Sequence, residues 1–252
     1  MTLDLRYLEQ NSGRIVPGPP RCLELYPTDM GYSNGQIDDY GERKRAEYPW
    51  RSGTVLRLSA RFSHPGNELV GTAGFGFWNA PFGDKHKVWP ALPKATWFFY
   101  ASRPSNLPLP LNGPGRGWFA STLDASSLTA IGLAPFAPAI LLLHNVRLIR
   151  NKLWPVIRRT LKISFMPISS EMDEWHTYEM IWLKGGCHFL VDGVAIMKTL
   201  FSPNGPLAFV AWIDNQYLIA TPRGRFGWGT VPIVEKQWLK IADLEIGSFD
   251  SQ

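Results

Sequence analysis

Polar side chains follow one apolar stretch of the sequence. The run Leu207–Ile213 has the composition of a buried strand, and residues 214–217 directly after it are polar or aromatic. Because side chains alternate between the two faces of a strand, Trp212 and Asp214 would share one face and Asn215 would lie on the other. Asp214 is therefore a candidate for a lone acid that handles a proton or binds a ligand. The alternative is a turn in which Asp214 and Asn215 bind their own backbone.

The other titratable residues show no catalytic or metal-binding pattern. Asp38 and Asp39 are adjacent, so in a strand they would point to opposite faces and could not form a dyad; we expect them in a solvated loop. The five histidines and two cysteines lack the spacing of metal ligands, so no metal site is predicted. The glycines match neither a Rossmann fingerprint nor a P-loop, and we expect no cofactor. Tyr100 is the second candidate for proton handling.

Aromatic residues in strand-like runs form a second set of candidates: Trp78, Trp97, Phe99, Tyr100, Trp118 and Trp212. Such side chains could stack on sugars, line an apolar pocket or simply fill a β-sandwich core. Core is the default interpretation for most of them, but we expect at least two to line a cavity. The predicted site thus has Asp214 and Tyr100 as catalytic candidates, and its predicted ligand contacts are Trp78, Trp97, Phe99, Trp118, Trp212 and Asn215.

Short β-rich runs separated by Gly, Pro, Asn and Asp must position these residues. Several alternate as half-buried strands do, and Asp192–Gly193 is a strong hairpin signal between two of them. Spacing and composition predict a sandwich of two antiparallel sheets in a single domain, residues 1–252. The expected strands are Cys22–Tyr26, Gly53–Phe62, Val70–Trp78, Ala95–Ala101, Gly117–Leu123, Trp175–Trp182, Cys187–Val191, Ala195–Thr199, Leu207–Ile213 and Trp238–Ile246.

The segment 128–165 differs from the rest of the chain. Helical periodicity over 146–163 places apolar side chains on one side and basic ones opposite, and Pro155 is expected to split or kink the helix. We predict an amphipathic, basic helical insertion. It would cover an edge or mouth of the sandwich, with its basic face in water or against an anionic membrane. Its apolar stretch is far shorter than the roughly 20 residues of a transmembrane helix.

Charge and cysteine content exclude several classes of protein. The net charge is +5, but the six basic residues between positions 125 and 170 account for it, which argues against a protein-wide nucleic-acid surface. Two cysteines are too few for a disulfide framework. The first residues lack the apolar region of a secretory signal. We therefore expect a cytoplasmic protein, with peripheral membrane contact through 128–165 as an option.

Several of the expected strands carry motifs of a known superfamily. The runs Glu174–Trp182 (EWHTYEMIW) and Cys187–Gly193 (CHFLVDG) resemble two adjacent strands of the family-16 glycoside hydrolases, of laminarinase and lichenase type. The runs Ser52–Arg61, Gly74–Asn79 and Trp238–Ile246 are similar to three further strands of that family. The resemblance implies a concanavalin A-like jelly-roll β-sandwich. It also implies that the strand before Asp214 lies in the concave sheet, with Asp214 facing a groove.

The catalytic motif of that family is missing. Its enzymes carry E-x-D-x-(x)-E on the strand after the "FW" strand, because a retaining hydrolase needs two carboxylates about 5–5.5 Å apart. The corresponding run here, Lys94–Ser102, has no carboxylate, and the nearest acids are Asp84 and Asp124. Aromatic residues 97–100 stand in their place, which would make the groove floor apolar.

Two functions remain as hypotheses from the sequence. The first is a non-hydrolytic groove protein that binds, or isomerises or cyclises, a bulky and largely apolar small molecule near a membrane. The second is a glycan-binding protein or a degenerate or atypical β-glucanase, in which the same tryptophans would stack on sugar rings.

Overall fold

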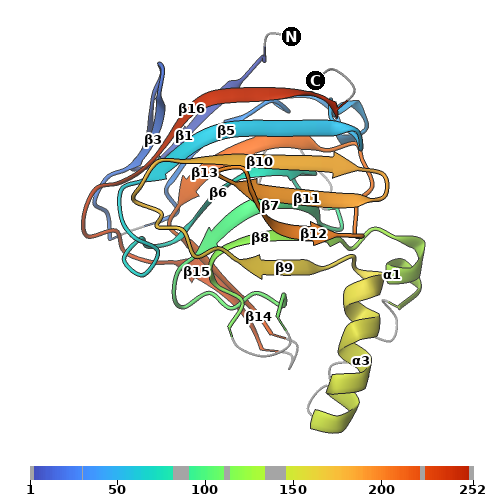
Figure 1. The fold of residues 1–252 in the computed structure, drawn as a ribbon. Helices are drawn as coiled ribbons and strands as arrows, with labels where there is room; N and C mark the ends of the chain where they lie inside the picture. The colour runs from blue at the N-terminus through green and yellow to red at the C-terminus, as the bar shows by residue number, and fades with distance from the viewer. Residues whose placement is uncertain are drawn as a thin grey trace.

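A computed structural model describes residues 3–29, 31–81, 91–110, 114–133, 146–221 and 225–249. Two seven-stranded antiparallel sheets lie face to face (Figure 1). Sheet A holds, in spatial order, β1 (Arg6–Gln10), β4 (Asn34–Asp38), β13 (Ala208–Asp214), β6 (Thr72–Trp78), β7 (Lys94–Ala101), β8 (Gly117–Asp124) and β9 (Ser164–Pro167). Sheet B holds β12 (Val194–Thr199), β11 (Gly186–Val191), β10 (His176–Leu183), β5 (Thr54–Phe62), β16 (Gln237–Ser248), β3 (Arg21–Leu25) and β2 (Gly13–Val16).

This architecture confirms the predicted jelly-roll β-sandwich of two antiparallel sheets. All ten expected strands are present, with boundaries within two residues of those expected. A separate two-stranded hairpin pairs β14 (Gln216–Ala220) with β15 (Phe226–Thr230), and a short 3-10 helix, η1, covers Arg45–Glu47. The core between the sheets is continuous and mostly aromatic on the side of sheet A.

The predicted helical segment contains α1 (Leu128–Leu133) and α3 (Arg147–Thr160), and its residues 134–145 lie outside those the structure describes. The expected split into two helices at Pro155 is wrong, because α3 runs through it. A proline removes the hydrogen bond to the carbonyl four residues earlier. Here that carbonyl belongs to Asn151, which is exposed, so water can satisfy it. No helix of the described residues is long and apolar enough to cross a membrane.

The expectation of a solvated loop at Asp38 and Asp39 is also wrong. Asp38 ends β4, and both side chains are buried. Asp38 accepts hydrogen bonds from Arg6 and Gln36, while Asp39 accepts one from the Trp50 indole and one from a backbone amide. Burial raises the pKa of Asp39 to about 6. The acids are tolerated inside because each has its own set of donors.

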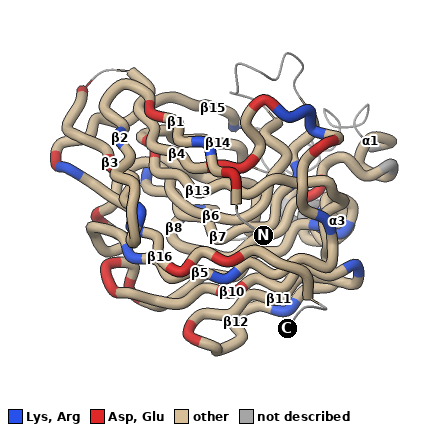
Figure 2. Tube along the Cα trace, turned by 90° about the horizontal axis from the view of Figure 1, so that it is seen from above, with Lys and Arg blue, Asp and Glu red and all other residues tan. Residues whose placement is uncertain are grey.

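The two outer faces of the sandwich differ in character. On sheet B the outer face is polar, with Arg57 paired to Glu179 across β5 and β10. Figure 2 shows acidic and basic residues interspersed along β5, β10 and β16. On sheet A the outer face of β13, β6, β7, β8 and β9 is mostly apolar and forms a second hydrophobic cluster, separate from the core between the sheets. The outer face of β1 and β4 is mostly polar. Over its middle strands sheet A is therefore largely apolar on both faces, as a sheet covered on both sides would be.

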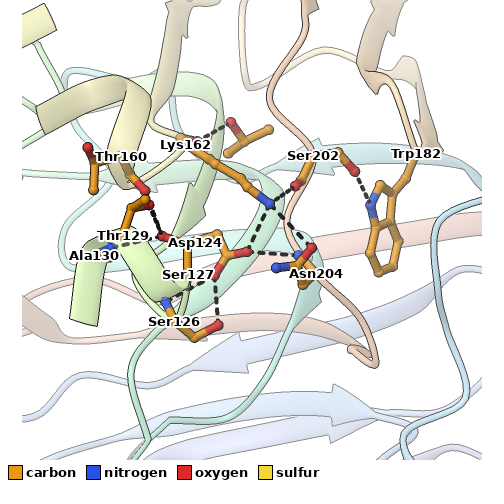
Figure 3. A network of polar contacts seen from close by, with 11 residues as sticks. Asp124, Ser126, Ser127, Thr129, Ala130, Thr160, Lys162, Trp182, Ser202 and Asn204 are labelled. Carbon is orange, nitrogen blue, oxygen red and sulfur yellow. Dashed lines mark hydrogen bonds and ion pairs between the residues drawn. The ribbon is translucent and has the colours of Figure 1, made fainter. Parts of the chain in front are cut away.

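A polar network fixes the end of α3 to the sandwich (Figure 3). The helix ends where Lys162 takes a left-handed conformation, with φ of 49°. The Lys162 ammonium donates to the carboxylate of Asp124 at 3.3 Å and to the carbonyl of Ser202 at 2.8 Å. Asn204 donates its backbone amide to the same carboxylate at 2.9 Å, and Ser202 accepts the indole N–H of Trp182. This network joins the helical insertion to β8 and to the core.

Replacing Lys162 by Met should destabilise the protein by about 2 to 3 kcal/mol, because the fully buried carboxylate of Asp124 then has no cation beside it. The double variant D124N/K162M should recover part of that loss, since no charge is then left unpaired. Lys152→Met on the exposed side of α3 is the matched control. Denaturant unfolding measures all four proteins; a loss of equal size in K162M and K152M would contradict this role.

Candidate functional site

The outer face of sheet A carries aromatic side chains in neighbouring rows across the strands. In one row Trp212 of β13, Gly74 of β6, Phe99 of β7 and Phe119 of β8 lie side by side. In the next row Trp97 of β7 lies beside Gly76 of β6. We call the resulting set the aromatic layer; its members are Trp78, Trp97, Phe99, Phe119, Phe165 and Trp212.

The two glycines leave room for the large rings of the aromatic layer. A Cβ atom on Gly74 would lie 2.3 Å from the Phe98 carbonyl oxygen and 3.0 Å from the indole of Trp212. A Cβ atom on Gly76 would lie 2.6 Å from the Cα atom of Trp97. Strand glycines of this kind mark a close approach of neighbouring groups. The pattern Gly74-Phe-Gly76-Phe therefore places rings on the inner face and space on the outer one.

Ring contacts run through the whole aromatic layer. The Trp97 centroid lies 4.8 Å from Phe99, 5.6 Å from Trp212 and 6.2 Å from Trp78. Phe119 continues the layer from Phe99 at 5.4 Å. The three Trp97 pairs are tilted by 38° to 49°, so these rings do not form one flat platform.

Access to the aromatic layer is uneven. Phe99, Phe119 and Trp212 are buried, whereas Trp78 and Trp97 are half-buried. Phe165 is half-buried as well, and half-buried leucines pack around the layer: Leu107, Leu123 and Leu161. The solvent-facing part of the layer is thus apolar, and Trp97 is its centre.

Asp214 fixes the orientation of one ring in the layer. The indole N–H of Trp212 donates to the Thr72 hydroxyl at 2.9 Å, and that hydroxyl donates to Asp214 at 2.8 Å. Asp214 also accepts from the Gln216 amide at 3.0 Å and from the Tyr32 hydroxyl at 3.4 Å. Burial raises the pKa of Asp214 to about 6. Asp214 shares the outer face with Trp212, but its carboxylate is occupied by protein donors.

Asn215 holds loops together at the end of the same strand. Its side-chain oxygen accepts the Ser33 amide at 2.8 Å, and its side-chain nitrogen donates to the carbonyls of Gly31 and Val231. The Asp214 bond to the Gln216 amide is of the local kind that a strand-end turn makes, whereas the Asn215 contacts reach distant segments of the chain. The structure therefore places Asn215 beside the site rather than in the aromatic layer.

Tyr100 and Trp118 lie on the other side of sheet A from the aromatic layer. Both belong to the core between the sheets. The Tyr100 hydroxyl donates to the carbonyls of Gly66 and Leu69, and burial raises its pKa well above the ordinary range. The structure thus does not bring Tyr100 together with Asp214. The reason is parity: Tyr100 is one residue from Phe99, and adjacent strand residues face opposite ways.

The outer face of sheet A lacks a pair of carboxylates at hydrolase spacing. Among the described strands of this sheet, alternation places two acids on the outer face, Asp38 and Asp214. Asp38 lies opposite Val210, four residues from Asp214 along β13. Four residues of a strand span about 13 Å, whereas glycosidases need about 5 to 9.5 Å. Asp84 lies outside the described residues, and Asp124 is held by the Lys162 network.

Four aromatic residues of this face were missed from the sequence. Tyr40 and Tyr48 pack at 5.6 Å from each other, and Tyr40 lies 6.4 Å from Trp78. Phe119 and Phe165 extend the layer on β8 and β9, at 4.8 Å from each other. Alternation within Gly117–Leu123 could have separated Phe119 from Trp118. Nothing in the sequence around the two tyrosines indicates the fold of their loop.

Comparisons with known proteins give a fold and no family. The sequence matches no family model and has no significant match among curated proteins. The carbohydrate recognition domain of Emp47p is similar in structure, with a TM-score of 0.48, 11% identity, and coverage of 97% of this chain and 88% of that one. A pseudo beta-1,3-glucanase of Mycobacterium tuberculosis has a TM-score of 0.46, 12% identity and coverage of 90% and 75%.

A chain described as a sialidase has a TM-score of 0.43 and 8% identity. It is matched over 98% of this chain, but this chain spans only 17% of its length. These likenesses concern the arrangement of strands alone.

The pH dependence of stability should change when Asp214 is replaced by Asn. The folded pKa of about 6 lies above the ordinary 3.8, so the folded state holds the proton more tightly. The wild type therefore loses stability as pH rises from about 4 to 6. Asn has the same shape and does not ionise, so its free energy of unfolding has no such pH dependence at this position. Between pH 4 and pH 7 the free energy of unfolding of the variant should therefore rise by about 2 to 3 kcal/mol relative to that of the wild type.

Denaturant unfolding across this pH range measures the difference. Asp4→Asn, at an exposed carboxylate, is the control. Parallel pH profiles for wild type and D214N would show that the Asp214 carboxylate is not destabilised by its burial.

Proposed function

We propose that the chain is a non-hydrolytic binding protein that takes an apolar small molecule against the aromatic layer of sheet A. The observation that carries the proposal is the partly exposed, apolar centre of this layer at Trp97 and Trp78. A sheet face that packs as a core but is not fully covered is where an apolar ligand gains most from burial.

The polar groups around the layer favour an apolar ligand over a sugar. A sugar needs free donors and acceptors beside the ring on which it stacks. Here Gln36 donates to Asp38 and to Tyr40, each at 2.8 Å, and Asp38 is also paired with Arg6. Together with the occupied carboxylate of Asp214, these contacts leave little for sugar hydroxyls. We therefore place the glycan-binding or degenerate β-glucanase alternative second.

One donor in the layer has no partner. The indole nitrogen of Trp78 is shut off from solvent and, in the part of the chain that the structure describes, has no hydrogen-bond acceptor. A buried N–H without a partner costs about 1 to 3 kcal/mol. A ligand oxygen would satisfy it if binding moves aside the side chains that cover it, so the proposed ligand is apolar with one acceptor group.

Binding is better supported than catalysis. An isomerase or cyclase would need a proton-transfer group facing the ligand. Tyr100 faces the core, and the Asp214 carboxylate accepts three hydrogen bonds from the protein. We assign Asp214 the role of positioning Trp212 through Thr72.

Anilinonaphthalene sulfonate, an apolar dye with acceptor oxygens, should bind at the aromatic layer. Trp97→Leu should weaken its binding about tenfold, because it removes the central ring while leaving an apolar side chain. Trp238→Leu, at a half-buried tryptophan on the outer face of sheet B, is the matched control and should bind as wild type. Fluorescence titration measures both.

If W97L and W238L bind the dye with equal affinity, the dye binds outside the aromatic layer. Native mass spectrometry of freshly purified protein should in addition show a co-purified apolar molecule. Retention on laminarin or lichenan, lost in W97L, would instead support the glycan alternative.

Trp78→Phe should distinguish ligands with an acceptor from ligands without one. The substitution keeps an aromatic ring and removes the N–H donor. It should weaken the sulfonate dye about tenfold and leave pyrene, which has no acceptor, unchanged. If the substitution weakens the binding of both probes equally, Trp78 contributes only the shape of its ring and not its N–H donor.

A further inference from the structure

The β14–β15 hairpin presents an uncovered apolar face. In the run Phe226-Gly-Trp228-Gly-Thr, alternation puts both rings on one face, and both are exposed, at 69% and 70%. Their centroids lie 5.3 Å apart. Their cross-strand partners are Ala220 and Leu218, so this face is apolar except for the pair Gln216 and Thr230 at its end.

The hairpin is held by its other contacts and does not need that face for folding. Asn106 exchanges two backbone hydrogen bonds with it, one to Leu218 and one to Ala220. On the opposite face Tyr217 packs over Gly229. An exposed aromatic pair on a hairpin fixed in this way marks an interaction surface rather than an unfinished core.

Charge on the same side of the molecule indicates the kind of partner. In Figure 1 the hairpin and α3 both project from the lower side of the sandwich. On α3, Lys152 and Arg159 are exposed beside exposed Val156. The sequence has no acid in residues 125–170 or 215–234. Exposed Trp and Phe with unopposed basic charge are the composition of a surface that enters an anionic lipid interface.

We propose that the β14–β15 hairpin and α3 together dock the protein on an anionic membrane surface. Phe226 and Trp228 enter the headgroup and acyl boundary, while Lys152 and Arg159 bind lipid phosphates. Membrane contact through residues 128–165 alone was expected from the sequence; the hairpin adds a second, aromatic contact. The proposal does not depend on a ligand at the aromatic layer.

Vesicle co-sedimentation of the full chain tests the proposal. Wild type should bind vesicles of phosphatidylcholine mixed with phosphatidylglycerol and bind pure phosphatidylcholine much more weakly. The variant F226S/W228S should lose more than about tenfold in affinity, because two rings no longer leave water. K152Q/R159Q should lose about fivefold for each charge removed.

Val194→Ser, at a 67% exposed apolar residue in a hairpin of sheet B, is the matched control and should bind as wild type. Trp97→Leu should also leave vesicle binding unchanged, which separates this proposal from the proposed ligand site. Far-ultraviolet circular dichroism verifies that each variant is folded.

The proposal is wrong if the wild-type protein does not bind anionic vesicles. It is also wrong if F226S/W228S binds them with the affinity of the wild type. Light scattering gives a further outcome. If F226S/W228S dissociates an oligomer without changing vesicle affinity, the hairpin joins copies of this chain and the lipid proposal is wrong.

Discussion

Over its middle strands sheet A is largely apolar on both faces, and much of the structure follows from that constraint. One face is covered by sheet B, which supplies a continuous core. The other face must be covered by loops, by the segment after α3, or by something bound. Tyr40, Tyr48 and Ile163 cover part of it, while Trp78 and Trp97 remain partly exposed. The outer face of sheet B does not need to be covered, because it carries charged pairs that water can solvate.

The strands with clear apolar or alternating patterns were predictable, and those without them were not. β5 alternates and β13 is apolar up to Asp214, so both are visible in the sequence. β4 reads Asn-Gly-Gln-Ile-Asp and looks like a loop, yet it is buried because Arg6 and Tyr40 bind its polar side chains. The β14–β15 hairpin is short and rich in glycine. Long-range hydrogen bonds decide these elements, and local propensity does not.

The candidate site was predictable as a set of strands but not as a set of side chains. The run Trp97-Phe-Phe-Tyr100 is aromatic throughout, so its composition gives no signal of which residues face outward. The structure shows which face each side chain lies on: Trp97 and Phe99 lie on the outer face, and Phe98 and Tyr100 face the core. Trp118 was misplaced for the same reason. Asp214 was placed on the correct strand and face, but its donors from Thr72 and Tyr32 come from distant segments.

The central claim is that the aromatic layer, and no other tryptophan of the protein, receives an apolar ligand. Fluorine nuclear magnetic resonance of fluorotryptophan-labelled protein tests it directly, with resonances assigned by single substitutions. On titration with anilinonaphthalene sulfonate, the resonances of Trp78, Trp97 and Trp212 should shift, while those of buried Trp182 and of Trp238 on sheet B stay in place. Shifts confined to Trp238 or Trp228, with Trp97 unmoved, would contradict the account.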